Sequence, residues 1–136
     1  MNESLKVTRK FHVACRQHGR KQIRDGSAPD VPVGRVPRIG RLMALAIRCD
    51  QLIGDGVVAN QSELANFGHI TTARMTQIMT LLNLAPDIQE QLLLLPRTER
   101  GRDKIIENDV RLIAQTFDWS KQRRLWLNLQ RSVEQT

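Results

Sequence analysis

Two short apolar patterns flank a Gly68-His69 step within residues 61–80, and they constrain the fold more than any other part of the chain. Five apolar residues fall where two short crossed helices must touch. These are Leu64, Ala65, Ile70, Met75 and Ile78. Two helices that cross steeply need a small residue at the contact, and Ala65 supplies it. The spacing therefore predicts a helix-turn-helix, with helices over about 61–67 and from residue 71 or 72 to about 83.

The second predicted helix carries polar side chains that suit a DNA surface. Helix faces in solvent favour Glu and Lys, because their helix propensity is higher than that of Thr. Here the polar residues are Thr and Gln, and no acidic residue occurs from Gly68 to Leu84. We therefore expect this helix to enter the major groove of DNA. The alternative is an ordinary amphipathic helix pair that only builds a core.

Side-chain chemistry predicts which residues contact bases and phosphates. Arg74 can donate two hydrogen bonds to guanine, and Gln77 can pair with adenine. A role for Arg74 limited to phosphate or solvent is the alternative. The residues expected on the recognition helix are Thr71, Thr72, Ala73, Arg74, Thr76, Gln77 and Thr80. Gln61 and His69 are expected at the DNA backbone.

The turn between the two helices departs from the usual pattern at one position. Glycine usually stands four residues after the small crossing residue, but here that position is His69 and Gly68 comes one residue earlier. Either His69 adopts a left-handed backbone, which His tolerates better than branched residues do, or the turn is shifted by one residue.

The net charge of +7 resides in the first 41 residues. Residues 1–41 hold ten Lys and Arg against three acidic residues, whereas residues 42–136 hold eleven of each sign. A basic arm on a neutral body is typical of contact with a polyanion, because Lys and Arg displace counterions from phosphates. A merely soluble basic tail is the alternative. The arm residues expected at the DNA backbone are Lys6, Lys10, Arg16, Arg20, Lys21, Arg35 and Arg38.

The arm itself shows a strand pattern followed by a linker. Residues 5–13 alternate between apolar and polar, and 17–20 are suited to turning the chain back through 21–24 as a short β-hairpin. A helix over Val7–Arg16 is the alternative. Residues 25–38 contain three prolines and two glycines, which is typical of a linker.

Beyond the arm the pattern is helical. An amphipathic helix is expected from Ile39 to about Ile53, with Cys49 on its inner face, and Asn60 with Glu63 forms a capping box for the next helix. Leu92–Leu95 should place a helix that begins at Pro86 deep in the core or in a subunit interface. The residues expected to point inward from two further helices, over about 103–116 and from Asp118 to about Val133, are Ile105, Ile106, Val110, Ile113, Phe117, Trp119, Leu125, Trp126 and Leu129.

Several other classes of protein are not indicated. No run of about 18 uncharged apolar residues occurs, so we expect no membrane span, and the N-terminal residues lack a signal-peptide core, so we expect a cytoplasmic, nucleoid-associated protein. His12, Cys15 and His18 supply three soft ligands where zinc requires four, so we expect no metal and no cofactor. Without a phosphate-binding loop, a catalytic triad or any tyrosine, the chain is not expected to be an enzyme.

Residues 63–93, ELANFGHITTARMTQIMTLLNLAPDIQEQLL, resemble the helix-turn-helix region of the ParB/KorB family of plasmid-partition proteins and repressors. A closer resemblance, over about residues 36–126, is to helix-turn-helix proteins and tails associated with serine recombinases on bacterial mobile elements. VPRIGRLMALAIRCDQLIGDGVV, LAPDIQEQLLLLP and DWSKQRRLW carry it. The nucleotide-binding motifs of the partition proteins and the recombinase catalytic domain are absent, so neither activity is implied.

The expected protein is thus mainly α-helical. It has a basic arm and linker over 1–38, a helix-turn-helix core over 39–96 and a C-terminal helical pair over 97–136. We expect a sequence-specific, homodimeric double-stranded DNA-binding protein that acts as a transcriptional regulator or recombination accessory factor of a phage or mobile element. A serine recombinase is a candidate partner. The alternative is a protein-interaction adaptor for a recombinase or polymerase subunit, whose docking surfaces are Leu92–Leu95 and Trp119 with Trp126.

Overall fold

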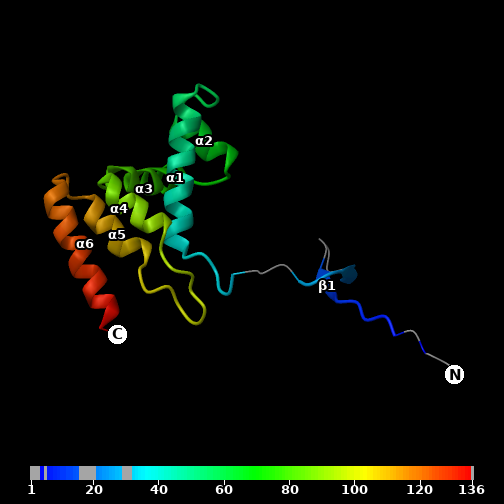
Figure 1. Cartoon of the computed structure of the whole chain (residues 1–136). Helices are drawn as coiled ribbons and strands as arrows, with labels where there is room; N and C mark the ends of the chain where they lie inside the picture. Colours follow the sequence, from blue (N-terminus) through cyan, green and yellow to red (C-terminus); the bar gives the residue numbers. More distant parts are fainter. Residues whose placement is uncertain (1–3, 5, 16–20, 29–31, 136) are drawn as a thin grey trace. The chain divides into compact units, whose positions relative to one another are not determined.

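The computed structural model describes residues 4, 6–15, 21–28 and 32–135, without the side chain of Cys15. The chain divides into two units, Met1–Pro32 and Val33–Thr136, which are described separately (Figure 1). As predicted, the protein is mainly helical and carries one small antiparallel hairpin. None of the helices in the described ranges combines the length and apolar character needed to cross a membrane.

The first unit contains the hairpin. Strand β1 (Phe11–Cys15) pairs with β2 (Lys21–Asp25), and Val13 lies opposite Ile23. The strand alternative for this segment is therefore confirmed, but β1 begins six residues later than the predicted start at residue 5. The backbone N–H of Gly26 donates to the carbonyl of Lys10 at 2.8 Å, and Gly26 then turns the chain away with φ 96°. Residues 6–9 consequently have no strand partner within the described part of the arm.

The second unit is built from helices. They are α1 (Arg38–Gly54), α2 (Gln61–Phe67), α3 (Thr72–Met79), the 3-10 helix η1 (Thr80–Asn83), α4 (Pro86–Leu93), α5 (Glu107–Ala114) and α6 (Trp119–Glu134). Figure 1 shows α1 and α2 at one side of this unit and α6 at the other, with α3, α4 and α5 between them. Continuation of α3 through η1 ends this segment at Asn83, where the sequence predicted its end.

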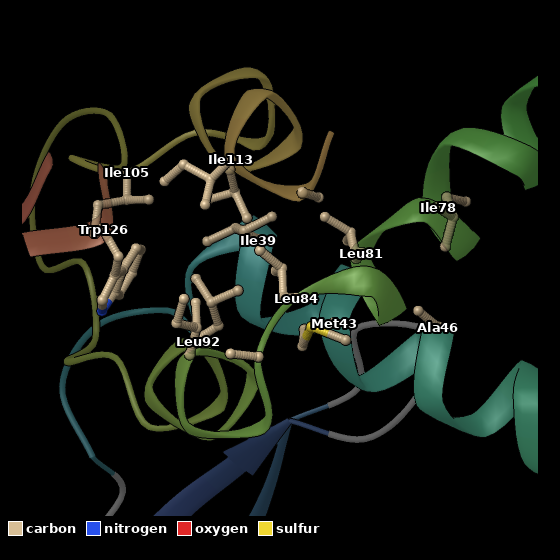
Figure 2. Packing of buried hydrophobic residues seen from close by; sticks show 14 residues of the cluster. Ile39, Met43, Ala46, Ile78, Leu81, Leu84, Leu92, Ile105, Ile113 and Trp126 are labelled. Carbon is tan, nitrogen blue, oxygen red and sulfur yellow. The ribbon is translucent and has the colours of Figure 1, made fainter. Parts of the chain in front are cut away.

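The larger of the two apolar clusters of the second unit joins α1, α3, η1, α4, α5 and α6 (Figure 2). It includes Ile39 and Met43 of α1, Leu92 of α4 and Trp126 of α6, all of them buried. The predicted inner face of α1 is thus confirmed, including Cys49, which is buried; burial raises the pKa of its thiol. The core runs across the predicted boundary between residues 96 and 97, so the C-terminal helices pack as part of the same body as α1.

The second unit also begins earlier than residue 39. The backbone groups of Arg35 and Thr98 exchange two hydrogen bonds, at 3.0 and 2.9 Å. The backbone N–H of Arg38 donates to the carboxylate of Asp103 at 2.9 Å. The last residues of the predicted linker are therefore attached to the helical body.

These same contacts explain why α5 begins at Glu107, four residues later than predicted. Asp103 is held by Arg38 and by the hydroxyl of Thr98 at 2.7 Å, which keeps the segment before α5 irregular. Ile106 is therefore the extended residue immediately before α5, and its side chain is exposed.

Other apolar residues expected to point inward are also exposed. Phe117 lies in the short turn between α5 and α6 and is 86% exposed, and Trp119 and Leu125 of α6 are about half exposed. Leu93 and Leu94 are exposed as well, so of the Leu92–Leu95 run only Leu92 is fully buried. The core takes one stripe of each helix, because within the described second unit no further layer packs on the opposite faces.

Candidate nucleic-acid interface

The start of α2 is fixed by two side chains. Asn60 accepts a hydrogen bond from the backbone N–H of Glu63 at 2.9 Å, as the capping box predicts. The carboxylate of Glu63 accepts from the backbone N–H of Ala59 at 2.9 Å, one residue before the usual partner. At the other side of the helix, Ala65 is buried against Cys49 of α1 and Met75 of α3. The small residue thus lies where the three helices meet.

The turn between α2 and α3 has its left-handed residue at His69. His69 has φ 54°, whereas Gly68 has a helical φ of −82°. Of the two predicted alternatives, the left-handed His69 is confirmed. The backbone N–H of Ile70 donates to the carbonyl of Ala65 at 3.1 Å, which closes the turn and leaves Thr71 extended as the cap of α3.

The outward face of α3 consists of small and uncharged polar side chains. Thr72, Ala73, Thr76 and Gln77 are exposed, whereas Met75, Ile78 and Met79 are buried on the opposite face. The hydroxyls of Thr76 and Thr80 donate to the carbonyls of Thr72 and Thr76, at 3.0 and 2.8 Å. Because these protons are used within the helix, the threonine oxygens remain as acceptors beside their methyl groups. Such a surface suits base edges and thymine methyl groups.

Arg74 differs from its neighbours because it is engaged by another helix. Its two terminal nitrogens donate to the two carboxylate oxygens of Glu107, the first residue of α5, at 2.5 and 3.0 Å. One of these nitrogens also donates to Gln77 at 3.2 Å. The hydrogen bond from Arg74, together with the charges of Arg74, Arg111 and Arg38, lowers the pKa of Glu107. The same hydrogen bond and the charge of Glu107 raise the pKa of Arg74.

A shallow groove lies beside this ion pair. It is lined by Arg38, Arg74, Ile106, Glu107, Asn108 and Arg111. Arg111 lies 3.7 Å from the Glu107 carboxylate, and its guanidinium donates to Asn108 at 3.1 Å. The sequence interpretation missed both Glu107 and Arg111. The spacing of these two residues on one helix was readable, but nothing in the sequence linked Glu107 to Arg74, which is 33 residues away.

The other residues predicted to contact the DNA backbone belong to both units. Lys6, Lys10 and Lys21 are exposed in the first unit, and Arg16 and Arg20 lie outside the described residues. In the second unit, Gln61 is half-buried as the first residue of α2, and His69 is exposed. Arg35 donates to Asp103 at 3.0 Å, and Arg38 begins α1 with an exposed side chain.

Two smaller groups of side chains have hydrogen-bond partners in the structure. Arg123 of α6 pairs with Asp87 of α4 through three contacts between 3.0 and 3.3 Å. The side chain of His12 lies 3.2 Å from the carbonyl of Gly26, whereas His18 falls outside the described residues. Over residues 4, 6–15, 21–28 and 32–135, no three potential metal ligands cluster.

Comparison of the chain with protein-family models, curated proteins and solved structures finds no match. The functional assignment therefore depends on the site itself.

Proposed function

We propose that this protein is a sequence-specific double-stranded DNA-binding protein in which α2 and α3 act as a helix-turn-helix. The observation that carries the proposal is the outward face of α3, where Thr72, Ala73, Thr76 and Gln77 are exposed and no residue is acidic. The apolar residues on the other side of α3 anchor it to α1 and α2. A short helix held in this way can present its polar face to the major groove without repelling phosphates.

In this proposal, affinity and selectivity come from different parts of the chain. The arm supplies contacts with phosphates that weaken as salt rises, because each neutralised phosphate releases counterions. The α3 face supplies the choice of sequence. A homodimer would bind two half-sites about one helical turn apart, in the role of a transcriptional regulator or recombination accessory factor of a phage or mobile element. A serine recombinase is the candidate protein partner.

Selection of bound duplexes from a random pool tests the proposal. We expect one enriched motif, and a homodimer predicts that it recurs as a palindrome or repeat with a spacing of about 10 bp. A pool that stays random after repeated selection with folded protein would contradict sequence-specific binding.

Two variants link the enriched motif to α3. Replacing the exposed Gln77 by Ala should change or relax the preference at one base position, because a bidentate contact discriminates by about 1–3 kcal/mol. Gln51→Ala, at an exposed position of α1, is the matched control and should leave the motif unchanged. A motif that responds equally to both substitutions would show that α3 does not read the sequence.

One observation favours a second candidate, a protein-interaction adaptor. Leu94 is 74% exposed and Trp119 is about half exposed, which leaves apolar surface for a partner. Trp126 does not belong to that surface, because it is 2% exposed and donates to Gln91 at 2.7 Å. Binding to mixed-sequence duplex after removal of the arm separates the two candidates, since an adaptor should then show almost none.

A further inference from the structure

The groove beside α3 holds more positive charge than its single carboxylate can balance. Arg38, Arg74 and Arg111 face one acidic side chain, Glu107, so the groove has two uncompensated charges. The side chains of Arg74, Arg111 and Glu107 are between 17% and 28% exposed, and that of Arg38 is exposed. The guanidinium groups of Arg74 and Arg111 are therefore only partly solvated, and all three remain within reach of a ligand.

The geometry of the ion pair matches that of a phosphate contact. Arg74 offers two parallel N–H donors, and Glu107 presents two oxygens to them. A phosphate diester presents a similar pair of oxygens with a negative charge, and Arg binds both groups in the same bidentate way. Glu107 thus occupies the position that a phosphate would take at Arg74.

We propose that this groove binds a phosphate group and that Glu107 competes with the phosphate for Arg74. The inference rests on the proposed function in assigning the phosphate to a DNA backbone beside the α3 face, and free phosphate is the other source of the same chemistry. When the phosphate binds, Arg74 turns from Glu107 to the ligand, while Arg38 and Arg111 neutralise the charge now shared by the carboxylate and the phosphate. Glu107 is therefore a residue that limits affinity, and Arg111 is a phosphate ligand.

Binding of the full chain to a mixed-sequence duplex, measured by fluorescence anisotropy over a series of salt concentrations, tests the proposal. Glu107→Gln keeps the shape of the side chain, removes its charge and should tighten binding by about tenfold, since one competing ion pair is lost. Asp109→Asn is the matched control, because it removes the same charge from the first turn of α5 but lies outside the groove. If both variants tightened binding equally, the effect would come from the change in net charge alone, and the proposal would be overturned.

A second pair of variants tests the groove without altering Glu107. Arg111→Gln should weaken binding and reduce the slope of log affinity against log salt by about 1. Arg131→Gln removes an exposed arginine of α6 that does not line the groove, and it should leave the slope nearly unchanged. Equal slopes for Arg111→Gln and the unaltered protein would overturn the assignment of Arg111, whether or not Glu107→Gln folds.

Titration with inorganic phosphate distinguishes the two sources of ligand. With a DNA-backbone phosphate, the NMR signals of the Arg74 side chain should shift with duplex and stay unchanged with inorganic phosphate at equal ionic strength. A saturable shift with inorganic phosphate alone would support the groove and overturn its assignment to DNA. Because the anisotropy experiment uses DNA of mixed sequence, failure of the groove variants is separable from failure of Gln77→Ala to alter the selected motif.

Discussion

The side-chain oxygen of Gln122 on α6 accepts a hydrogen bond from the backbone N–H of Ala85, 37 residues earlier, at 2.8 Å. Its amide nitrogen donates to the carbonyls of Asn83 and Thr116, at 3.1 and 2.6 Å. Gln122 is fully buried, and no buried side-chain nitrogen or oxygen among the described residues lacks a partner. The amide of Gln122 therefore forms hydrogen bonds with the backbone at the end of η1 and at the start of α4, and these bonds hold α6 against the segment that joins them.

Replacing Gln122 by Leu should lower the free energy of unfolding by about 2–4 kcal/mol. The substitution leaves the buried N–H of Ala85 and two partly buried carbonyls without their side-chain partner, and each such group is costly. Urea unfolding followed by circular dichroism measures the change. Gln51→Leu, at an exposed position of α1, is the control and should change stability by less than about 0.5 kcal/mol. Similar losses in both variants would contradict the role of the buried amide.

His69 should tolerate Gly but not Val. Its φ of 54° is strained for a branched side chain, so His69→Val should cost more than about 1 kcal/mol, whereas His69→Gly should be close to neutral. Thermal unfolding measures both variants. Gly68→Ala is the control, because the added Cβ would meet its nearest atom, the Leu64 carbonyl oxygen, at an ordinary 3.6 Å. A Gly68→Ala variant less stable than His69→Val would place the left-handed residue at position 68.

Asp103 should make the protein sensitive to acid. The pKa of Asp103 is lowered, chiefly because its carboxylate accepts the backbone N–H of Arg38 and also the Thr98 hydroxyl. A carboxyl group with a lowered folded-state pKa stabilises the fold above its unfolded pKa of about 3.9, and this contribution is lost as pH falls through the folded pKa.

Asp103→Asn should therefore reduce stability at neutral pH and make stability vary less between about pH 5 and pH 2 than in the unaltered protein. Urea midpoints measured across this range check the prediction. The exposed Asp50→Asn serves as control. Parallel pH curves for Asp103→Asn and the unaltered protein would show that Asp103 does not contribute to the acid dependence.

Removal of residues 1–32 should weaken DNA binding without loosening the helical unit. This segment holds seven Lys and Arg against three acidic residues, so its loss should reduce the salt slope by up to about 6 while the sequence preference remains. Removal of residues 1–38 should in addition lower the melting temperature, because it takes away the contacts of Arg35 and Arg38 with Thr98 and Asp103. Anisotropy and thermal unfolding of both truncations measure these effects. A truncation that loses the preference but keeps the slope would contradict the proposed division between arm and α3.

Local signals in the sequence were reliable where neighbouring residues decide the structure. The caps of α2 and α6 follow from Asn60 and Asp118, each of which accepts a hydrogen bond from a backbone N–H two or three residues ahead. The inner face of α1 follows from its apolar spacing, and the end of η1 lies at the predicted Asn83. The hairpin alternation was readable too, although its first strand is shorter than predicted.

The errors lie where a distant segment decides. The start of α5 was predicted too early because Asp103 is held by residues 35 and 38, and periodicity cannot show such a contact. Phe117 and Trp119 were expected inside from their helical spacing, but both are exposed, whereas Trp126 is buried in the core. Whether a large apolar side chain is buried depends on which other helices pack against it, and that packing is a property of the whole fold.

The sequence by itself determined the mainly helical fold, the caps of α2 and α6, the absence of acidic residues from Gly68 to Leu84 and the basic character of the arm, because these depend on residue type and short spacing. The tertiary structure alone decided that Glu107 lies against Arg74. A carboxylate from a residue 33 positions away thus lies beside α3, which has no acidic residue of its own. The physical reason is that an ion pair between two helices depends on how the helices pack, and the packing of α3 and α5 is set by the core that Ile78 of α3 shares with Val110 and Ile113 of α5.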